Sequence, residues 1–495
     1  MFNKIKNCYL NSSKKNILIY LFIFLITFSL VYTSTLNPFT KRIMNVDTSV
    51  YVTITQGISR GLVLYQDLAD NKGPLTYLIS LPGFLVGGIT GIWITEFIIL
   101  FITFIFMHKT ALLFVEKKTA LFSVFFTSLA MHPFFYVNAG AEEYSLPFLT
   151  ISLFIFTKHY IKNKVSFFDI LILGICFSSS IMIRLNMFPL WAGFCFSILI
   201  ESIIKKKYLD LIKYIGAFCL GICFVFIPIL LYMKHNNIFN EFYHNVIMGG
   251  VTRGFRLLIL RDFLHNFYTI INRSFSFIPL CIGTIWLFMK YKNINFFYFL
   301  GFIFSYFLSV LFLSFSLGNS HYNLILIPFF VPALAFLSDS ILNLFFMVKC
   351  KYLALLIFFC ITFSEGIIRF SYYMFFNFDS VTPLKIAGKI IDEHTQPGDK
   401  ILNLGWNGYI YPYTKRDYAS KYIFQSEAFD HIPGAREEFI SSIKNNKPRV
   451  MTIFTAEYGA NYQFRAGWHE EILALLETNY TLISNEYGIQ IFLLN

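Results

Sequence analysis

Charged residues are scarce in this chain. Only 14% of its 495 residues are Asp, Glu, Lys or Arg, whereas 56% are hydrophobic and the mean hydropathy is +0.60. An ordinary soluble domain is about a quarter charged, and 62 Phe and 30 Tyr cannot stay solvated in a disordered chain. The composition therefore excludes a soluble globular or disordered protein and predicts a polytopic membrane protein.

Cysteine frameworks and nucleotide-binding motifs are also lacking. The 8 cysteines stand singly, nearly all in apolar runs, so the sequence predicts neither a disulfide scaffold nor a zinc site. Neither a Gly-x-x-x-x-Gly-Lys-Ser/Thr loop nor a Gly-x-Gly-x-x-Gly turn occurs where a phosphate would need it, and an acyl-hydrolase elbow is missing. ATP-driven transport is therefore disfavoured, and nothing indicates a redox centre.

The net charge of +12 reflects 40 Lys and Arg against 28 Asp and Glu. These basic residues are spread between apolar runs, as in the cytoplasmic loops of an inner-membrane protein, so no nucleic-acid partner is expected. The first apolar run begins at Ile17 and lacks a small-residue cleavage site, which predicts an uncleaved first helix and not a signal peptide.

Apolar runs long enough to cross a bilayer predict a polytopic α-helical membrane protein with about eleven spans. With the N-terminus in the cytoplasm, basic loops such as Lys117/Lys118 come out on the cytoplasmic side. The apolar segment 74–91 contains Pro82, Gly87 and Gly88, and we expect it to be interfacial or re-entrant. The expected spans lie near residues 17–36, 93–115, 119–138, 144–160, 168–187, 189–204, 210–232, 273–289, 294–315, 321–341 and 352–370.

This topology leaves three segments outside the cell membrane: the first loop (residues 37–92), the middle loop (residues 234–272) and everything after Phe370. The last segment changes to polar composition, with turns and with short strand-like and helix-like runs. We therefore expect a transmembrane domain over 1–370 and a small soluble α/β domain over 371–495, facing the outside of the plasma membrane. Its expected strands are 400–404, 449–454 and 489–494, and its expected helices are 383–394, 435–445 and 467–478.

The first loop carries Asp47 close to the end of the first span. A carboxylate at the outer membrane surface can act as a general base towards an acceptor hydroxyl or amine. Alternatively, Asp47 caps the helix that follows through Val50 and Ile54. The two roles are compatible.

A polar cluster, Tyr65–Pro74, closes the same loop and contains Asp70 and Lys72 just before an apolar segment. A lysine at this depth is well placed to bind a lipid phosphate. The alternative is that Lys72 only extends its ammonium group to the headgroups.

Glu142 and Glu143 lie between the third and fourth expected spans, at the outer end of an apolar hairpin. Neighbouring helical residues diverge by about 100°, so the two acids do not both point at one ligand. One of them could face Asp47 and help to bind an amine or a divalent metal. Solvation at the surface is the alternative.

Several basic side chains are expected outside, where an anionic ligand would explain them. Arg184 falls near the outer end of the fifth span, and a membrane arginine usually faces a cavity or a partner. Arg253 and Arg256 belong to the middle loop. The alternatives to an anionic ligand are that this loop is too long to obey the positive-inside rule, or that it lies amphipathically on the membrane. His321 could donate to a phosphate oxygen, although a lone histidine is more often an ordinary polar residue.

These motifs together resemble bacterial membrane glycosyltransferases of the GT-C class, over the membrane region to residue 370. The likeness is to the family 39 group, which contains protein O-mannosyltransferases and lipid A aminoarabinose transferases. The motifs are Val46-Asp47 with Tyr51, the turn Asp70-Asn71-Lys72-Gly73-Pro74-Leu75, Glu142-Glu143-Tyr144 and His321-Tyr322.

The resemblance implies a GT-C-like fold and a donor sugar linked to polyprenyl phosphate, with an envelope glycan, lipid or protein as acceptor. It implies that Asp47 is catalytic and that the turn from Lys72 to Leu75 contacts the donor. The family often has Glu where this chain has Thr48, and Gly73 replaces a proline. The candidate site comprises Asp47, Glu142 and Glu143 as catalytic residues, Lys72, Arg184, Arg253, Arg256 and His321 for the donor phosphate, and Tyr51, Asp70 and Tyr322 for other substrate contacts.

Three other interpretations stay open. A transporter or flippase of lipid-linked sugars also explains the aromatic spans and outer cations, although no internal repeat supports it. An envelope oligosaccharide ligase or polymerase would use a diphosphate-linked donor and place its key residues in one large outer loop. The third is a structural or receptor role for the C-terminal domain. Separately, the sequence leaves open whether a divalent metal is required.

Overall fold

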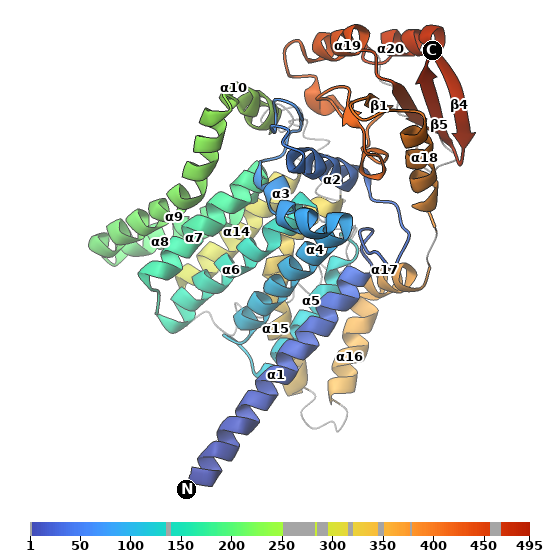
Figure 1. The fold of residues 1–495 in the computed structure, drawn as a ribbon. Helices are drawn as coiled ribbons and strands as arrows, with labels where there is room; N and C mark the ends of the chain where they lie inside the picture. The colour runs from blue at the N-terminus through green and yellow to red at the C-terminus, as the bar shows by residue number, and fades with distance from the viewer. Residues whose placement is uncertain are drawn as a thin grey trace.

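The computed structural model describes residues 2–134, 140–250, 283–284, 296–314, 320–344, 351–376, 379–455 and 467–495. The candidate residues Arg253 and Arg256 lie outside these ranges, as does the expected span 273–289 apart from residues 283–284. Figure 1 shows a bundle of helices with the C-terminal domain at one end and the N-terminus at the other. The chain is therefore organised along one axis, as the expected topology requires.

Each of the other expected spans falls on a helix, except that the span 352–370 covers the two helices α16 and α17. Within the described residues, five helices are long and apolar enough to cross a membrane, and the pair α16–α17, bent by 77°, would make a sixth. The count of about eleven is therefore not confirmed. The bundle helices are α1 Phe2–Tyr32, α4 Leu81–Ala111, α5 Lys117–Met131, α6 Ala141–Lys162, α7 Phe167–Ile183, α8 Pro189–Ile204, α9 Tyr208–His235, α14 Phe296–Ser314, α15 Ile327–Leu344, α16 Lys351–Thr362 and α17 Ser364–Phe375.

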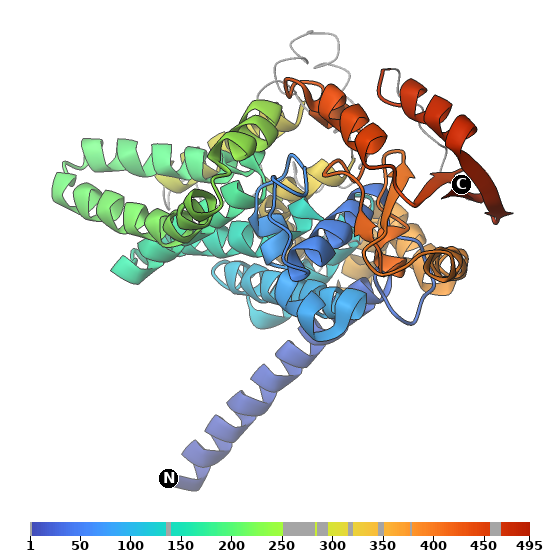
Figure 2. The same cartoon turned by 45° about the horizontal axis from the view of Figure 1, so that its top comes forward.

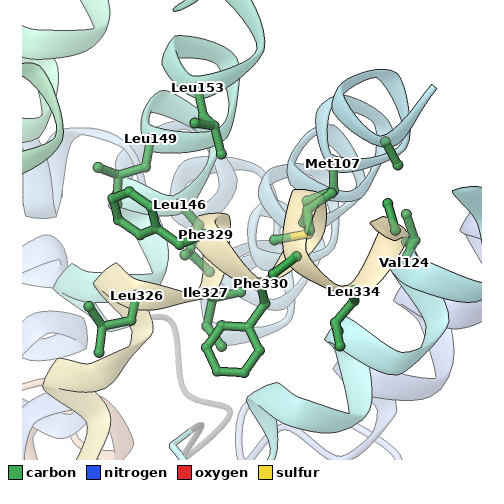
Figure 3. Packing of buried hydrophobic residues seen from close by; sticks show 14 of the residues in the cluster. Met107, Val124, Leu146, Leu149, Leu153, Leu326, Ile327, Phe329, Phe330 and Leu334 are labelled. Carbon is green, nitrogen blue, oxygen red and sulfur yellow. The ribbon is translucent and has the colours of Figure 1, made fainter. Parts of the chain in front are cut away.

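The helix α15 lies at the centre of the bundle, and 94% of the apolar window within His321–Asn343 is buried. Figure 3 shows Phe330 and Leu334 of this helix among side chains of α4, α5 and α6. By contrast, only 17% of the apolar window of α9 is buried, and Phe224 is exposed on its surface. An apolar helix with an exposed apolar face is typical of contact with lipid.

The helices α7 and α9 approach each other closely through glycines. A Cβ atom added to Gly174 would lie 2.1 Å from the carbonyl oxygen of Phe218, and one added to Gly221 would lie 2.1 Å from that of Leu171. Small residues at such crossings let two backbones meet in a membrane. This packing fixes α7, whose C-terminal end carries Arg184.

The segment 74–91 turns back on itself. It contains the short helix α3, Leu75–Leu78, and the first turns of α4, which Gly87 and Gly88 interrupt with non-helical backbone angles. A Cβ atom added to Gly91 would lie 1.8 Å from the carbonyl oxygen of Gly83, so the two pieces of α4 are in contact. Neither piece before the break approaches the length of a span, which agrees with an interfacial or re-entrant segment.

The C-terminal domain is a mixed five-stranded sheet with the strand order β2-β1-β3-β5-β4. The strand β1 pairs in parallel with β2 and β3, and the hairpin β4–β5 adds antiparallel to β3 with Val450 opposite Leu493. The expected strands and helices are confirmed, whereas β2 and β4 were not expected. The elements are β1 Lys400–Leu404, β2 Asp417–Tyr418, β3 Val450–Phe454, β4 Tyr480–Glu486, β5 Ile489–Leu494, α18 Thr382–Glu393, α19 Ala435–Asn445 and α20 Glu470–Asn479.

The first loop packs against this C-terminal domain. It forms the helix α2, Val46–Ser59, whose Val50 and Ile54 belong to one hydrophobic core with Leu402 of β1 and Phe429. Figures 1 and 2 show the blue α2 beside the orange segments of the C-terminal domain. Segments far apart in the sequence therefore form one unit at this end of the bundle.

Candidate active site

Asp47 occupies the first turn of α2, at the end of the bundle where the C-terminal domain sits. The N-cap residue of this helix is Asn45, whose side-chain oxygen accepts a hydrogen bond from the backbone N–H of Thr48 at 2.7 Å. Asp47 is therefore not the cap, although the helix dipole favours a carboxylate in the first turn. Its side chain is 55% exposed, so it is open to a substrate.

His321 lies opposite Asp47, at the start of the 3-10 helix Ser320–Leu326 that leads into α15. Its Nε2 is 4.0 Å from Oδ2 of Asp47, and its ring packs edge-on against Tyr322 with the centroids 4.4 Å apart. The guanidinium carbon of Arg184 stands 3.9 Å from the centroid of the Tyr322 ring. Tyr322 thus holds an imidazole and a guanidinium side by side through aromatic contacts.

Arg184 is the C-cap residue of α7 and forms an ion pair with Glu142, which lies in the first turn of α6. Glu142 is 5% exposed, and a buried carboxylate needs such a partner. This ion pair distinguishes the two adjacent acids, because Glu142 is the one that contacts Arg184. Glu143 is also buried, at 2% exposure, and nothing described brings it to Asp47.

The turn at Lys72 is fixed against the end of α7. The backbone N–H of Gly73 donates to the carbonyl oxygen of Ile183 at 3.0 Å. A Cβ atom added to Gly73 would lie 2.0 Å from the carbonyl oxygen of Met182, so only glycine fits without displacement of the backbone. This contact brings Lys72 to the residue that follows Ile183, which is Arg184.

Asp70 stabilises the turn through two hydrogen bonds. It is 2% exposed, it accepts hydrogen bonds from the hydroxyl of Tyr77 at 2.5 Å and from the backbone N–H of Asn71 at 2.6 Å. Burial raises the pKa of Asp70, and the nearby charge of Lys72 opposes that rise. Tyr51, also buried, packs edge-on against Tyr77 with centroids 6.1 Å apart. Tyr51 and Asp70, two of the three expected substrate contacts, thus lie buried in a packed layer of the first loop.

Lys72 itself is half-buried, and its Nζ donates to the side-chain oxygen of Asn71 at 2.8 Å. Desolvation lowers the pKa of Lys72; the charges of Asp70 and Asp47 counteract this, and that of Arg184 adds to it. These influences mean that Lys72, Arg184 and Asp47 share one electrostatic environment. Four elements, namely the first loop, α6, α7 and the 3-10 helix before α15, therefore converge on one cluster of charges.

The C-terminal domain contributes a part of the site that the sequence did not predict. The backbone N–H of Gly408 donates to Oγ of Ser49 at 2.9 Å, and Thr53 donates to the carbonyl oxygen of Gly408 at 3.2 Å. Burial and the charge of Asp47 raise the pKa of Tyr409 to about 12. In the sequence, the turn Trp406-Asn407-Gly408 after an expected strand was the signal that could have drawn attention to this loop. Its contact with α2 becomes visible only in the fold.

No group of three or more His, Cys, Asp or Glu side chains close enough to bind a metal ion occurs within the described ranges.

No family model matches the chain, and no curated protein matches it. Solved structures do. ArnT from Cupriavidus metallidurans is similar in the apo state, with a TM-score of 0.61, 11% identity and coverage of 97% of this chain and 98% of ArnT. The same protein bound to undecaprenyl phosphate gives a TM-score of 0.62 at 11% identity, with coverage of 95% and 97%.

A second similar protein is the archaeal oligosaccharyltransferase AglB from Archaeoglobus fulgidus, in complex with an inhibitory peptide and a dolichol-phosphate. Its TM-score is 0.54 at 10% identity, over 97% of this chain and 74% of AglB. At identities this low, the similarity supports the fold alone, and the chemistry has to be argued from the residues of the site. At the level of fold, the resemblance to GT-C membrane glycosyltransferases is confirmed, and the chain has the architecture of that class.

Proposed function

We propose that the chain is an integral-membrane glycosyltransferase that moves a sugar from a polyprenyl-phosphate-linked donor to an envelope acceptor, with Asp47 as the general base. One observation carries the proposal: the exposed carboxylate of Asp47 stands 4.0 Å from His321, in the same charge cluster as Lys72 and Arg184. A base beside a set of phosphate-binding groups is what transfer from a phosphate-linked sugar requires.

Lys72, Arg184 and His321 would bind the donor phosphate. Breaking the bond between the sugar and the phosphate leaves negative charge on the phosphate oxygens, which fixed cations and N–H donors stabilise. Glu142 and Tyr322 are positioning residues in this account, because they hold Arg184 through its ion pair and its ring contact. The remaining N–H groups of the guanidinium can then face the phosphate.

Asp47 would act on the acceptor. It takes the proton of the attacking hydroxyl or amine while the acceptor atom bonds to the anomeric carbon and the polyprenyl phosphate leaves. A direct displacement of this kind inverts the anomeric configuration. No nucleotide site is needed, because the donor is already activated and already in the bilayer.

The reaction would take place on the outer face of the plasma membrane, with the N-terminus in the cytoplasm. The site lies at the end of the bundle that carries the C-terminal domain, opposite the N-terminus (Figure 1). The apolar helices support a membrane location. The related folds of ArnT bound to undecaprenyl phosphate and AglB bound to dolichol-phosphate support a lipid-linked donor.

The proposal is tested by sugar transfer from the radiolabelled polyprenyl-phosphate pool of membranes, comparing wild type, Asp47→Asn and the control Asp417→Asn at equal expression. Asp417 lies on the edge strand β2, and its side chain is 58% exposed. We expect wild type and the control to move label to the acceptor fraction and Asp47→Asn to leave it on lipid. Equal transfer by all three would refute the role of Asp47. Label that changes membrane side without leaving the lipid would instead establish a flippase.

A further inference from the structure

A loop of the C-terminal domain, Gly405–Tyr409, leaves the carboxyl end of β1 and is called the strand-end loop below. The strand β1 lies between β2 and β3 and runs parallel to both. In open sheets with parallel strands, ligands bind outside the carboxyl ends of the strands. Gly408 places this edge of the sheet on α2, the helix that carries Asp47.

Buried amides hold the strand-end loop in one conformation. The Nδ2 of Asn403 donates to the backbone oxygen of Asn407 at 2.8 Å, and Thr452 donates to Oδ1 of Asn403 at 2.9 Å. The backbone N–H of Gly405 donates to Oε1 of Gln425 at 2.8 Å. Asn403, Gln425 and Thr452 are fully buried. A satisfied polar network inside a domain fixes geometry, as binding loops require.

The loop meets α2 from the side of the C-terminal domain, because Gly408 bonds to Ser49, two residues after Asp47. Lys72 and Arg184, which are assigned to the donor phosphate, belong to the first loop and to the end of α7. The direct displacement proposed above needs the acceptor and the leaving phosphate on opposite sides of the anomeric carbon. If the cations bind the phosphate, the acceptor comes from the side of the strand-end loop.

The side chains of the loop are aromatic and amide groups. The ring of Tyr409 packs on Phe454 with centroids 5.7 Å apart. The indole Nε1 of Trp406 is buried and has no hydrogen-bond partner among the residues that the structure describes. A buried donor of this kind needs an acceptor oxygen, and aromatic faces with a few amides suit a neutral, hydroxyl-rich ligand more than a cationic amine.

We propose that the strand-end loop is the acceptor subsite and that Trp406, whose side chain is half-buried, binds a neutral carbohydrate whose hydroxyl reaches Asp47; this rests on the proposed function. The hydroxyl proton passes to the carboxylate of Asp47, and the oxygen bonds to the anomeric carbon of the donor sugar. The bond from that carbon to the phosphate oxygen breaks, and polyprenyl phosphate leaves with the electron pair.

The test uses full-length protein in membranes with radiolabelled lipid-linked donor. Three probes are offered as acceptors: oligosaccharides released from the host envelope by mild acid, envelope peptides, and vesicles of phosphatidylethanolamine. Wild type is compared with Trp406→Ala, Trp406→Phe and the control Tyr487→Phe, which changes a 58% exposed tyrosine between β4 and β5. Binding of undecaprenyl phosphate and the thermal midpoint are measured for every variant.

We expect label to enter the oligosaccharide fraction. Trp406→Ala should raise its half-saturating concentration by roughly tenfold or more, with donor binding, the thermal midpoint and the control unchanged. Trp406→Phe should recover part of the loss. Transfer to peptide or phosphatidylethanolamine, or an acceptor dependence that Trp406→Ala leaves unchanged, would overturn the subsite. If wild type transfers label to no fraction, the proposed function itself fails, which is a different outcome.

Discussion

At the scale of the residue, the site depends on one glycine as much as on its charges. Gly73 touches the backbone of Met182 and donates to Ile183, and this contact sets Lys72 beside Arg184. The resemblance drew attention to Gly73 only as a departure from a proline. The contact with α7 gives that departure a physical reason, because a side chain at this position has no room.

Gly73→Ala is therefore expected to displace the turn that carries Lys72. The added Cβ would lie 2.0 Å from the oxygen of Met182, and overpacking of this kind typically costs about 1–3 kcal/mol of stability. The half-saturating donor concentration should rise as well. Gly140→Ala is the matched control, because its Cβ would meet nothing closer than 3.8 Å. Equal thermal midpoints and equal donor dependence for the two variants would contradict this account.

Most candidate residues were predictable because their types are unusual for their surroundings. A carboxylate after a span, a lysine in a Lys-Gly-Pro turn and an arginine in an apolar helix stand out without a structure. The interaction partners of these residues could not be predicted in this way. The pairing of Glu142 with Arg184 depends on how α6 and α7 pack, and the choice of Asn45 over Asp47 as the cap depends on a shift of two residues.

At the scale of the element, the bundle is positioned by helix contacts that periodicity alone does not reveal. The apolar runs predicted where helices lie, because a stretch of this length has few other uses. They did not predict which helix is central. The burial of α15 and the exposure of α9 follow from neighbours, and both sequences are similarly apolar. The strand β4 was missed because its pattern is mostly exposed and polar.

The contact between α7 and α9 makes a prediction at this scale. Gly221→Leu should separate the two helices, because a Cβ there would lie 2.1 Å from the oxygen of Leu171. We expect a loss of about 1–3 kcal/mol of stability and a shift of Arg184 that lowers transfer. Gly216→Leu, on the same helix with open space at its Cβ, should leave both unchanged. Thermal unfolding in detergent measures the difference, and similar midpoints would argue against this packing.

At the scale of the whole molecule, the C-terminal domain and the first loop share one hydrophobic core. The expected boundary at residues 370 and 371 divides the chain by composition, but the packing links the two parts through α2. The sequence could not predict this, because the contacting residues lie more than 350 positions apart. Asp47, the proposed general base, thus lies on the helix that links the bundle to the domain.

Ser49→Ala tests this junction. The substitution removes the oxygen that accepts the N–H of Gly408, and an unsatisfied buried donor costs about 1–3 kcal/mol. Ser59→Ala is the control, because Ser59 bonds the carbonyl of Gln56 within the same helix. We expect Ser49→Ala alone to lower the thermal midpoint and to speed proteolytic release of the C-terminal domain. Identical behaviour of the two variants would show that the hydrogen bond does not hold the domain.

The most direct test of the central claim is a single-turnover measurement on purified protein loaded with a radiolabelled undecaprenyl-phosphate sugar. Wild type and Asp47→Asn are mixed with the envelope acceptor fraction, and the loss of label from the lipid is followed. We predict that both proteins hold the donor and that only wild type transfers the sugar, because Asp47 acts on the acceptor. Transfer by Asp47→Asn at the wild-type rate would contradict the account.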